Sequence, residues 1–182
     1  KLENHLISLS NDKKVSTIIL RYFNVAGADK KNRSGLITNP DNLIKAVCEV
    51  AVGKRQELII NGNDYNTKDG TTIRDYIHVS DLAEMHILAA ENLMKKNLTK
   101  IYNCGYGVGF SIGDVVGSMN KILNKNIKIK YGPRRVGDAE YSVSDNTKFL
   151  NEFNWTPKMN SLDQILITSL DWEKMINKNP IK

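Results

Sequence analysis

The chain has 182 residues, of which 41% are hydrophobic and 25% are charged, and its formal net charge is +6. These values are ordinary for a globular protein that is long enough to bury a core. No apolar run approaches the roughly 20 residues that cross a membrane, and the lysines are spread along the chain without interleaved aromatic residues, so we expect neither a membrane nor a nucleic-acid partner.

The cysteines, Cys48 and Cys104, stand far apart, and each lies in an apolar segment. Isolated cysteines of this kind indicate buried free thiols, which fits the reducing cytoplasm. There is no Cys-x-x-Cys pair and the histidines are scattered, so the sequence predicts no metal site.

The first segments predict a helix followed by a buried strand. A helical apolar period covers residues 1–10, and residues 14–22 form a nearly continuous apolar run. Such a run is typical of a strand covered on both faces in a parallel sheet. In open α/β sheets ligands bind outside the carboxyl ends of strands, so Tyr22 and Asn24 are well placed for function. Tyr22 is equally compatible with a place in the core.

The next segments predict a helix, a short strand and a loop. Residues 42–52 form an amphipathic pattern that Gly53 ends, and residues 57–60 predict a strand. Residues 61–72 are rich in Gly, Asn, Asp and Thr, which is typical of a loop.

After this loop, Arg74 and Tyr76 lead into a short β-branched strand, and Asp81 follows where an amphipathic helix should begin. Asp is a good N-cap because its carboxylate accepts an orphan backbone N–H, so we expect the helix to start there. A loop that delivers an Arg and a Tyr to the edge of a sheet suits an anionic ligand, because the Arg fork matches phosphate geometry. An ordinary surface loop with a structural ion pair fits the same pattern.

The second half of the chain continues the alternation of helices and strands. Ser111 with Asp114 resembles a capping box, and Ser161 with Gln164 predicts a cap for the last helix. Alternating helices and strands indicate an α/β fold. The other expected elements are a helix over residues 82–93, strands over 100–104 and 127–131, a basic loop over 133–142 and a short helix over 146–153.

Several motifs resemble those of a known family, in the family's order and spacing. They are Arg21-Tyr22-Phe23-Asn24-Val25-Ala26-Gly27-Ala28, Pro40-Asp41-Asn42-Leu43, the segment from Asn61 to Asp81, Tyr102-Asn103-Cys104-Gly105, Pro133-Arg134-Arg135-Val136-Gly137-Asp138 and Trp155-Thr156-Pro157. On these motifs the chain resembles the nucleotide-sugar epimerases of the extended short-chain dehydrogenase/reductase family, most closely the UDP-glucose/UDP-galactose 4-epimerases. The resemblance covers nearly the whole chain but only the C-terminal part of such an enzyme.

The resemblance implies the last strands of a Rossmann-type parallel sheet joined to a smaller α/β domain that holds a nucleotide sugar. We expect residues 1–24 and 74–105 to belong to the NAD-binding Rossmann domain. Residues 25–73 and 106–182 are expected to form the discontinuous domain that binds a UDP-sugar.

The resemblance also assigns residues to a UDP-sugar and to NAD. A diphosphate calls for Arg forks and neutral donors that converge from several segments. The assigned residues are Arg74 and Arg135 for the diphosphate, Asp138 for the ribose, Asn24 and Asn42 for the phosphates, the Leu43 backbone N–H as a further donor, Tyr76 beside the diphosphate and the Tyr22 backbone for the nicotinamide. Arg135 and Asp138 are also compatible with a surface ion pair worth under about 1 kcal/mol.

The implied reaction is NAD-dependent 4-epimerisation of a UDP-hexose. In the family, hydride passes from C4 of the hexose to NAD while a Tyr removes the hydroxyl proton, and a Lys lowers the pKa of that Tyr. The keto sugar turns over in the pocket and the hydride returns to its other face. This chain has no Gly-rich fingerprint and no Tyr-x-x-x-Lys, so we expect it to be inactive alone and to be the C-terminal part of a homodimeric enzyme. Lys1 lies close to where the family's catalytic Lys falls.

The chain departs from the family pattern at Asn61 and Ser142. Asn61 stands where an aromatic residue is usual beside the uracil, which weakens stacking on the base but not the backbone contacts. Ser142 stands where some members carry a bulky Tyr. The small side chain leaves room for an N-acetyl group, so we expect the parent enzyme also to accept UDP-N-acetylglucosamine and UDP-N-acetylgalactosamine. Alternatively, the neighbouring Tyr141 fills that space.

Related functions fit part of the same pattern. They are a nucleotide-sugar dehydratase, a uronate epimerase, a decarboxylase and a non-catalytic module that binds nucleotide sugars. The loop around Asn63-Asp64-Tyr65 favours the hexose epimerase, because the other enzymes resemble this chain less there.

Overall fold

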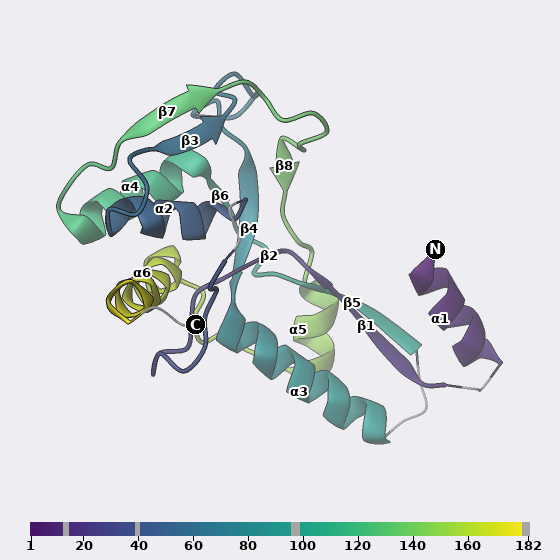
Figure 1. The fold of residues 1–182 in the computed structure, drawn as a ribbon. Helices are drawn as coiled ribbons and strands as arrows, with labels where there is room; N and C mark the ends of the chain where they lie inside the picture. Colours follow the sequence, from purple (N-terminus) through teal and green to yellow (C-terminus); the bar gives the residue numbers. More distant parts are fainter. Residues whose placement is uncertain (13–14, 39–40, 96–98, 180–182) are drawn as a thin grey trace.

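The computed structural model has an α/β architecture in which helices and strands alternate along the chain (Figure 1). It describes the chain except for residues 13–14, 39–40, 96–98 and 180–182, so Pro40 of the second motif lies outside the described residues. The helices are α1 (Leu2–Asn11), α2 (Leu43–Ala51), α3 (Val79–Lys95), α4 (Ile112–Leu123), α5 (Thr147–Phe153) and α6 (Leu162–Lys178). The strands are β1 (Thr17–Tyr22), β2 (Asn24–Ala26), β3 (Leu58–Asn61), β4 (Ile73–His78), β5 (Thr99–Cys104), β6 (Gly109–Ser111), β7 (Ile129–Gly132) and β8 (Tyr141–Ser142).

Strand β4 runs through the middle of the molecule and has more partners than its neighbours (Figure 1). It pairs in parallel with β2 and β8 and antiparallel with β6. Strands β1 and β5 form a separate parallel pair, in which Tyr22 lies opposite Cys104. Strands β3 and β7 form another parallel pair at the far end of the molecule. The fold class predicted from the sequence is therefore confirmed.

The buried side chains gather mainly in two clusters. One lies where α2, α4 and α6 pack on one another and on β3, and it includes Ile44, Met119 and Leu166. The other lies between β1, β5 and the helices α3 and α5, and it includes Met85 and Phe149. The two free cysteines are buried, as predicted, one in each cluster.

Two predicted helix starts are confirmed. Asn42 caps α2, since its side chain accepts the Lys45 backbone N–H, and Gly53 follows the helix with φ of 82°. Ser111 and Asp114 form a reciprocal capping box at the start of α4. In both places the signal is local, because a short polar side chain satisfies an N–H of its own first turn.

The predicted cap at Asp81 is wrong, and the predicted cap at Ser161 has the right position but lacks a side-chain hydrogen bond. Helix α3 begins at Val79, ahead of Asp81, because the His78 ring accepts the Ser80 backbone N–H at 3.1 Å. Asp81 is 2% exposed and instead binds a distant segment, accepting the Met159 N–H at 2.9 Å and the Tyr106 hydroxyl at 2.6 Å. Ser161 does sit at the N-cap of α6, but its side chain makes no capping hydrogen bond.

Strand β1 departs from the expectation of a strand covered on both faces. Residues 17–20 are only partly buried, and the last two residues, Arg21 and Tyr22, are exposed. The described part of the chain supplies one parallel neighbour, β5, so the other edge of β1 has no paired strand there. The first residue of the predicted strand, Lys14, lies outside the described residues.

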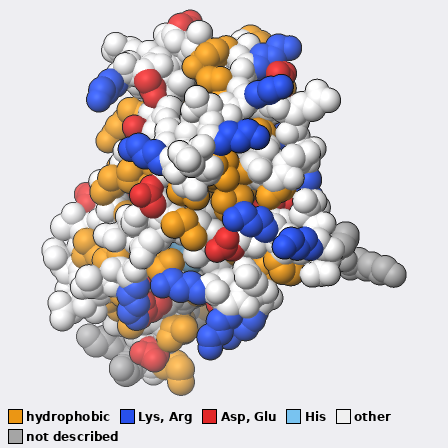
Figure 2. Space-filling model, turned by 90° about the vertical axis from the view of Figure 1, so that its left-hand side faces the viewer, with side chains coloured by type: hydrophobic (Ala, Val, Ile, Leu, Met, Phe, Trp, Pro, Cys, Tyr) orange, Lys and Arg blue, Asp and Glu red, His pale blue; other side chains and the backbone are white. Residues whose placement is uncertain are grey.

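The surface is mixed in character. On the face that Figure 2 shows, Lys and Arg side chains are distributed among acidic and hydrophobic ones. Within the described residues, each helix falls short of the length and apolarity that a membrane crossing needs.

Candidate functional site

The N-terminus of α2 presents backbone and side-chain hydrogen-bond donors. The Asn42 side-chain oxygen accepts the Lys45 N–H at 3.0 Å, which leaves the Asn42 amide NH₂ to point elsewhere. The first N–H groups of a helix have no acceptor within the helix, so the Leu43 N–H is also available to a ligand. The helix dipole makes this end favourable for an anion.

A cavity of about 630 Å³ opens at this helix end. It lies between α2, the strands β2, β3 and β4, and the loop that follows β7. Its lining residues are Asn24, Asp41, Asn42, Leu43, Ala46, Arg55, Leu58, Ile59, Asn61, Thr72, Arg74, Tyr76, Ile112, Arg135 and Asp138. Most of the residues that the sequence singled out are therefore brought together here from distant parts of the chain.

The arginines of this cavity are paired with carboxylates. Arg74 contacts Asp138 and also donates to the Ala139 carbonyl at 2.5 Å. Arg135 donates to Asp41 at 2.9 Å, and both of these side chains are more than half exposed. The sequence is also compatible with an ion pair between Arg135 and Asp138. In the structure Asp138 pairs with Arg74 instead, and Arg135 pairs with Asp41.

The strands fix the remaining polar groups. Asn24 lies opposite Tyr76 in the parallel β2–β4 pair, so both face the cavity at the same level. Tyr76 is 3% exposed, and burial raises the pKa of its hydroxyl, so it stays protonated at neutral pH. Ile59 and Asn61 alternate with buried neighbours on β3, which turns both toward the cavity.

Other predicted residues lie outside this cavity. Tyr22 ends β1, is 53% exposed, and its hydroxyl lies 2.5 Å from His86 Nε2. Ser142 on β8 lies opposite Arg74 in the parallel register but does not line the cavity. Lys1 precedes α1 at the opposite end of the molecule from α2 (Figure 1).

Two charged residues of the cavity, Asp41 and Arg55, have no role predicted from the sequence, although Asp41 lies in one of the family-like motifs. Asp41 precedes the predicted helix over residues 42–52, and Arg55 follows the glycine that ends α2. A basic residue after a helix and an acidic residue before one are common on ordinary surfaces. Their place in the cavity depends on the tertiary fold, which brings the β7 loop and β3 to α2.

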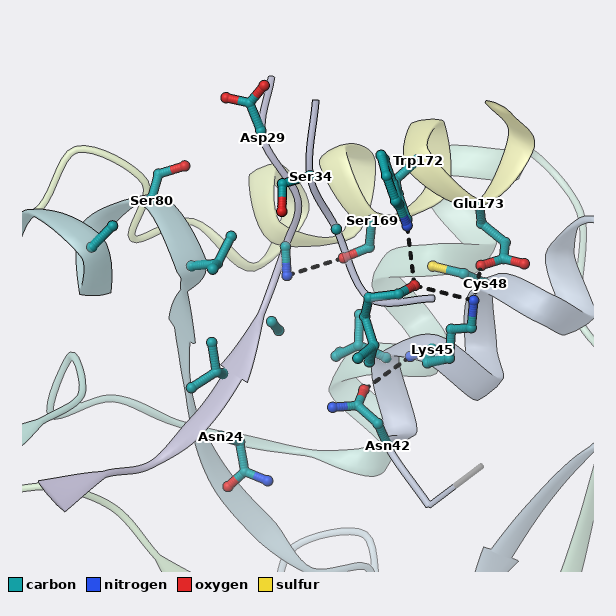
Figure 3. Close-up of a pocket in the computed structure, with 18 of the residues that line it drawn as sticks. Asn24, Asp29, Ser34, Asn42, Lys45, Cys48, Ser80, Ser169, Trp172 and Glu173 are labelled. Atoms are coloured by element: carbon teal, nitrogen blue, oxygen red, sulfur yellow. Dashed lines mark hydrogen bonds and ion pairs between the residues drawn. The ribbon is translucent and has the colours of Figure 1, made fainter. Parts of the chain in front are cut away.

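A larger cavity of about 1120 Å³ adjoins the first one and shares Asn24 and Asn42 with it. Figure 3 shows Asn24 and Asn42 at one end of it, Ser80 at the start of α3, and Trp172 and Glu173 on α6. Its wall includes the loop of residues 27–38 and buried Cys48. Burial raises the pKa of the Cys48 thiol to about 12, so this sulfur is not a ready nucleophile.

Fold and cavity together define an α/β protein with a polar pocket beside the N-terminus of α2 and the first residues of the parallel strands β2 and β4. The model of the NAD dependent epimerase/dehydratase family matches residues 2–105. The chain therefore belongs to that family.

Comparison with known proteins gives a closer likeness. The chain is 41% identical over 164 residues to the UDP-glucose 4-epimerase of Azospirillum brasilense, covering 90% of this chain and 47% of that protein. A structure of the UDP-glucose-4-epimerase from Stenotrophomonas maltophila, with bound NAD and formylated UDP-arabinopyranose, aligns with a TM-score of 0.93 at 30% identity over 97% of this chain and 53% of that chain. The UDP-Glc/GlcNAc 4-epimerase of Campylobacter jejuni aligns with a TM-score of 0.75 at 40% identity, covering 93% and 52% of the two chains. The chain thus spans about half the length of the relatives it matches.

Proposed function

We propose that this chain is the C-terminal half of an NAD-dependent UDP-hexose 4-epimerase and that its smaller cavity holds the UDP group. In this proposal Asn42, the Leu43 N–H, Arg74 and Arg135 bind the diphosphate and Asn24 binds a phosphate oxygen. Asp138 accepts from the ribose hydroxyls, Asn61 lies beside the uracil and Tyr76 closes the wall next to the diphosphate.

The single observation that carries the proposal is the convergence of these groups on one cavity of about 630 Å³. A helix N-terminus, neutral amides and Arg forks are complementary to a doubly charged diphosphate. The Arg74–Asp138 and Arg135–Asp41 pairs balance the charge of the cavity before a ligand binds. When a diphosphate binds, it would replace these carboxylates as the ion-pair partner of the two arginines.

We further propose a division of labour within the fold. Residues 1–24 and 74–105 would complete the NAD-binding domain, while 25–73 and 106–182 would form the UDP-sugar domain. Tyr22 and Cys104 end adjacent parallel strands, and the Tyr22 backbone at this strand end would meet the nicotinamide carboxamide. NAD, when bound, supplies the hydride acceptor and donor for C4 of the hexose.

The chain's own residues would orient the substrate rather than move the proton. The cavity fixes the UDP group, and the shared residues Asn24 and Asn42 direct the hexose into the larger cavity. The proton at the C4 hydroxyl would be handled by a Tyr upstream of this chain, with Lys1 as the proposed neighbour that lowers the pKa of that Tyr. We propose that the whole protein acts as a cytoplasmic homodimer.

The substrate range is proposed to include N-acetylated sugars. The small side chain of Ser142, which lies opposite Arg74 in the β4–β8 register, supports this. The alternative filler, Tyr141, is 62% exposed and packs against Gly109 on the other face of β8, away from Ser142. The similarity to the UDP-Glc/GlcNAc 4-epimerase of Campylobacter jejuni points the same way.

The test uses the protein extended upstream to its natural start. Interconversion of UDP-glucose with UDP-galactose, and of their N-acetyl counterparts, would be assayed side by side for the wild type and Ser142→Tyr. We expect activity on both pairs, with the N-acetyl activity reduced in the variant and the plain-hexose activity retained.

The other outcomes discriminate between functions. Equal N-acetyl activity in wild type and Ser142→Tyr would refute the role of Ser142. UDP binding without epimerisation would favour a related dehydratase, uronate epimerase or decarboxylase, or a binding module, and no UDP binding would refute the proposed site.

A further inference from the structure

A buried ion cluster lies between α2 and α6, in the wall of the larger cavity and apart from the groups proposed to bind the diphosphate. The Glu173 side chain is 1% exposed, and its two oxygens bind the ammonium groups of Lys45 at 2.5 Å and Lys54 at 2.7 Å. Lys45 is itself only 4% exposed and also lies 3.9 Å from Glu49. Burying these charges is costly unless each is fully paired, so the cluster tolerates little movement of either helix.

The same cluster holds the loop that leads into α2. Lys45 Nζ donates to the Leu36 carbonyl at 3.3 Å, and Trp172 Nε1 donates to the same carbonyl at 3.0 Å (Figure 3). Gly35 of this loop lies close against the Trp172 ring, since a Cβ added at Gly35 would stand 2.5 Å from a ring atom. Helix α6, the first turn of α2 and the preceding loop are thus joined at one point.

Lys45 connects this point directly to the cavity. It lies in the first turn of α2, and its backbone N–H is the group that the Asn42 side chain accepts at 3.0 Å. Its side chain reaches in the other direction, to Glu173 (Figure 3). Any shift of Lys45 therefore moves the Asn42 amide and the Leu43 N–H.

We propose that the Lys45–Glu173 pair positions the N-terminus of α2 for the diphosphate of the substrate, a role that rests on the proposed function of the cavity. Both are treated as positioning residues: they lie in the wall of the larger cavity, but neither lines the smaller cavity or is assigned a contact with the diphosphate. The pair would fix the donors before binding, so that less ordering is required when the ligand arrives.

Lys54 provides a matched control. It binds the same carboxylate with the same charge, but it follows the C-terminus of α2 and its side chain is 36% exposed. Lys45→Met and Lys54→Met each remove one ammonium group and leave Glu173 paired with the other. If loss of one ammonium group from the ion cluster is enough to weaken ligand binding, both variants should show the effect. If Lys45 positions α2, only Lys45→Met should show it.

The experiment compares both variants with the wild type in the full-length protein. We expect Lys45→Met to raise the KM for UDP-glucose and the Kd for UDP by about tenfold, with kcat changed by less than about twofold. We expect the amides of residues 42–46 to exchange hydrogen faster without ligand in this variant, and Lys54→Met to behave like the wild type in all three measurements.

Each other outcome has a definite meaning. Unchanged KM and exchange in Lys45→Met, or equal changes in both variants, would overturn the proposal. If the wild type binds no UDP, the proposed function fails. Even then, faster hydrogen exchange at the amides of residues 42–46 in Lys45→Met but not in Lys54→Met would support the role of the Lys45–Glu173 pair in positioning α2. If Lys45→Met does not fold, Lys45→Gln, which keeps a donor for the Leu36 carbonyl, is measured in its place under the same criteria.

Discussion

At the scale of single residues, Asn42 carries two roles that can be separated. Its oxygen caps α2 and its NH₂ is proposed to face a phosphate. Asn42→Asp keeps the cap, because a carboxylate also accepts the Lys45 N–H, but it places a negative charge at the diphosphate. We expect a Kd for UDP at least about tenfold higher with an unfolding free energy within about 0.5 kcal/mol of the wild type, measured by calorimetry and urea denaturation.

The companion variant Asn42→Ala removes the cap as well as the amide. It should lose about 1 kcal/mol of stability in the same urea titration, because an N–H of the first turn loses its acceptor. If Asn42→Asp lost as much stability as Asn42→Ala, the capping role would be wrong. If it bound UDP as tightly as the wild type, the phosphate contact would be wrong.

At the scale of elements, the junction of β4, α3 and α6 depends on a neutral histidine. His78 is fully buried, its Nδ1 accepts the Ser80 N–H, and its Nε2 lies 3.0 Å from Thr168 Oγ1. Burial lowers the pKa of His78 from 6.5, with Lys30 acting in the same direction and Asp81 against it. The unfolded chain therefore takes up a proton more readily than the folded one, and this contribution to stability is present above about pH 6.5 and lost as the pH falls.

We expect the unfolding free energy of the wild type to fall between about pH 7.5 and about pH 5.5, above the range where most carboxylates titrate. His78→Gln should be less stable at both pH values, yet its stability should change less between them. Equal pH dependence of the two proteins in urea denaturation would assign the effect to other groups.

The helices and strands also show which elements could be predicted from the sequence alone. Helices with a strong apolar period and a local cap, such as α2 and α4, were predicted within a residue or two. Strands β2, β6 and β8 were missed, because elements of two or three residues are defined by their partners on β4 and not by a pattern of their own. The cap assigned to Asp81 failed for the same reason, since its partners near Met159 are distant in sequence.

The candidate site follows the same rule. Asn24, Asn42 and Arg74 were found because they lie in motifs that resemble a family, and their convergence on one cavity needed the fold. Arg55 and the Lys45–Glu173 pair lie in no such motif. Glu173 in particular falls on the last helix, for which the sequence pattern predicts a cap at Ser161 and no buried charge. Spacing along a helix does not distinguish a buried carboxylate from a surface one.

At the scale of the whole molecule, Asp75 ties the strand β4 to two loops far along the chain. Its carboxylate is 0% exposed and accepts the N–H groups of Tyr106 and Gly107, each at 2.9 Å, and the Ser144 hydroxyl at 2.6 Å. Asp75→Asn places an NH₂ group among these donors, so we expect the unfolding free energy to fall by about 2–4 kcal/mol. Urea denaturation measures this change.

The exposed Asp145 in one of the same loops is the control for that measurement. Its side chain accepts the nearby Thr147 backbone N–H at 3.1 Å, so Asp145→Asn should cost less than about 1 kcal/mol. A similar loss in both variants would mean that the buried network adds nothing beyond an ordinary surface contact.

The sharing of Asn24 and Asn42 by the two cavities bears on how a long ligand gains affinity. A nucleotide in one cavity and a hexose in the other are joined by a covalent bond, so once one part is seated the other is presented at a high effective concentration. The free hexose would lack this advantage and bind far more weakly than its share of the contacts suggests. Binding of the sugar would then depend on binding of the nucleotide to which it is joined. Different sugars would be accepted as long as the nucleotide group binds.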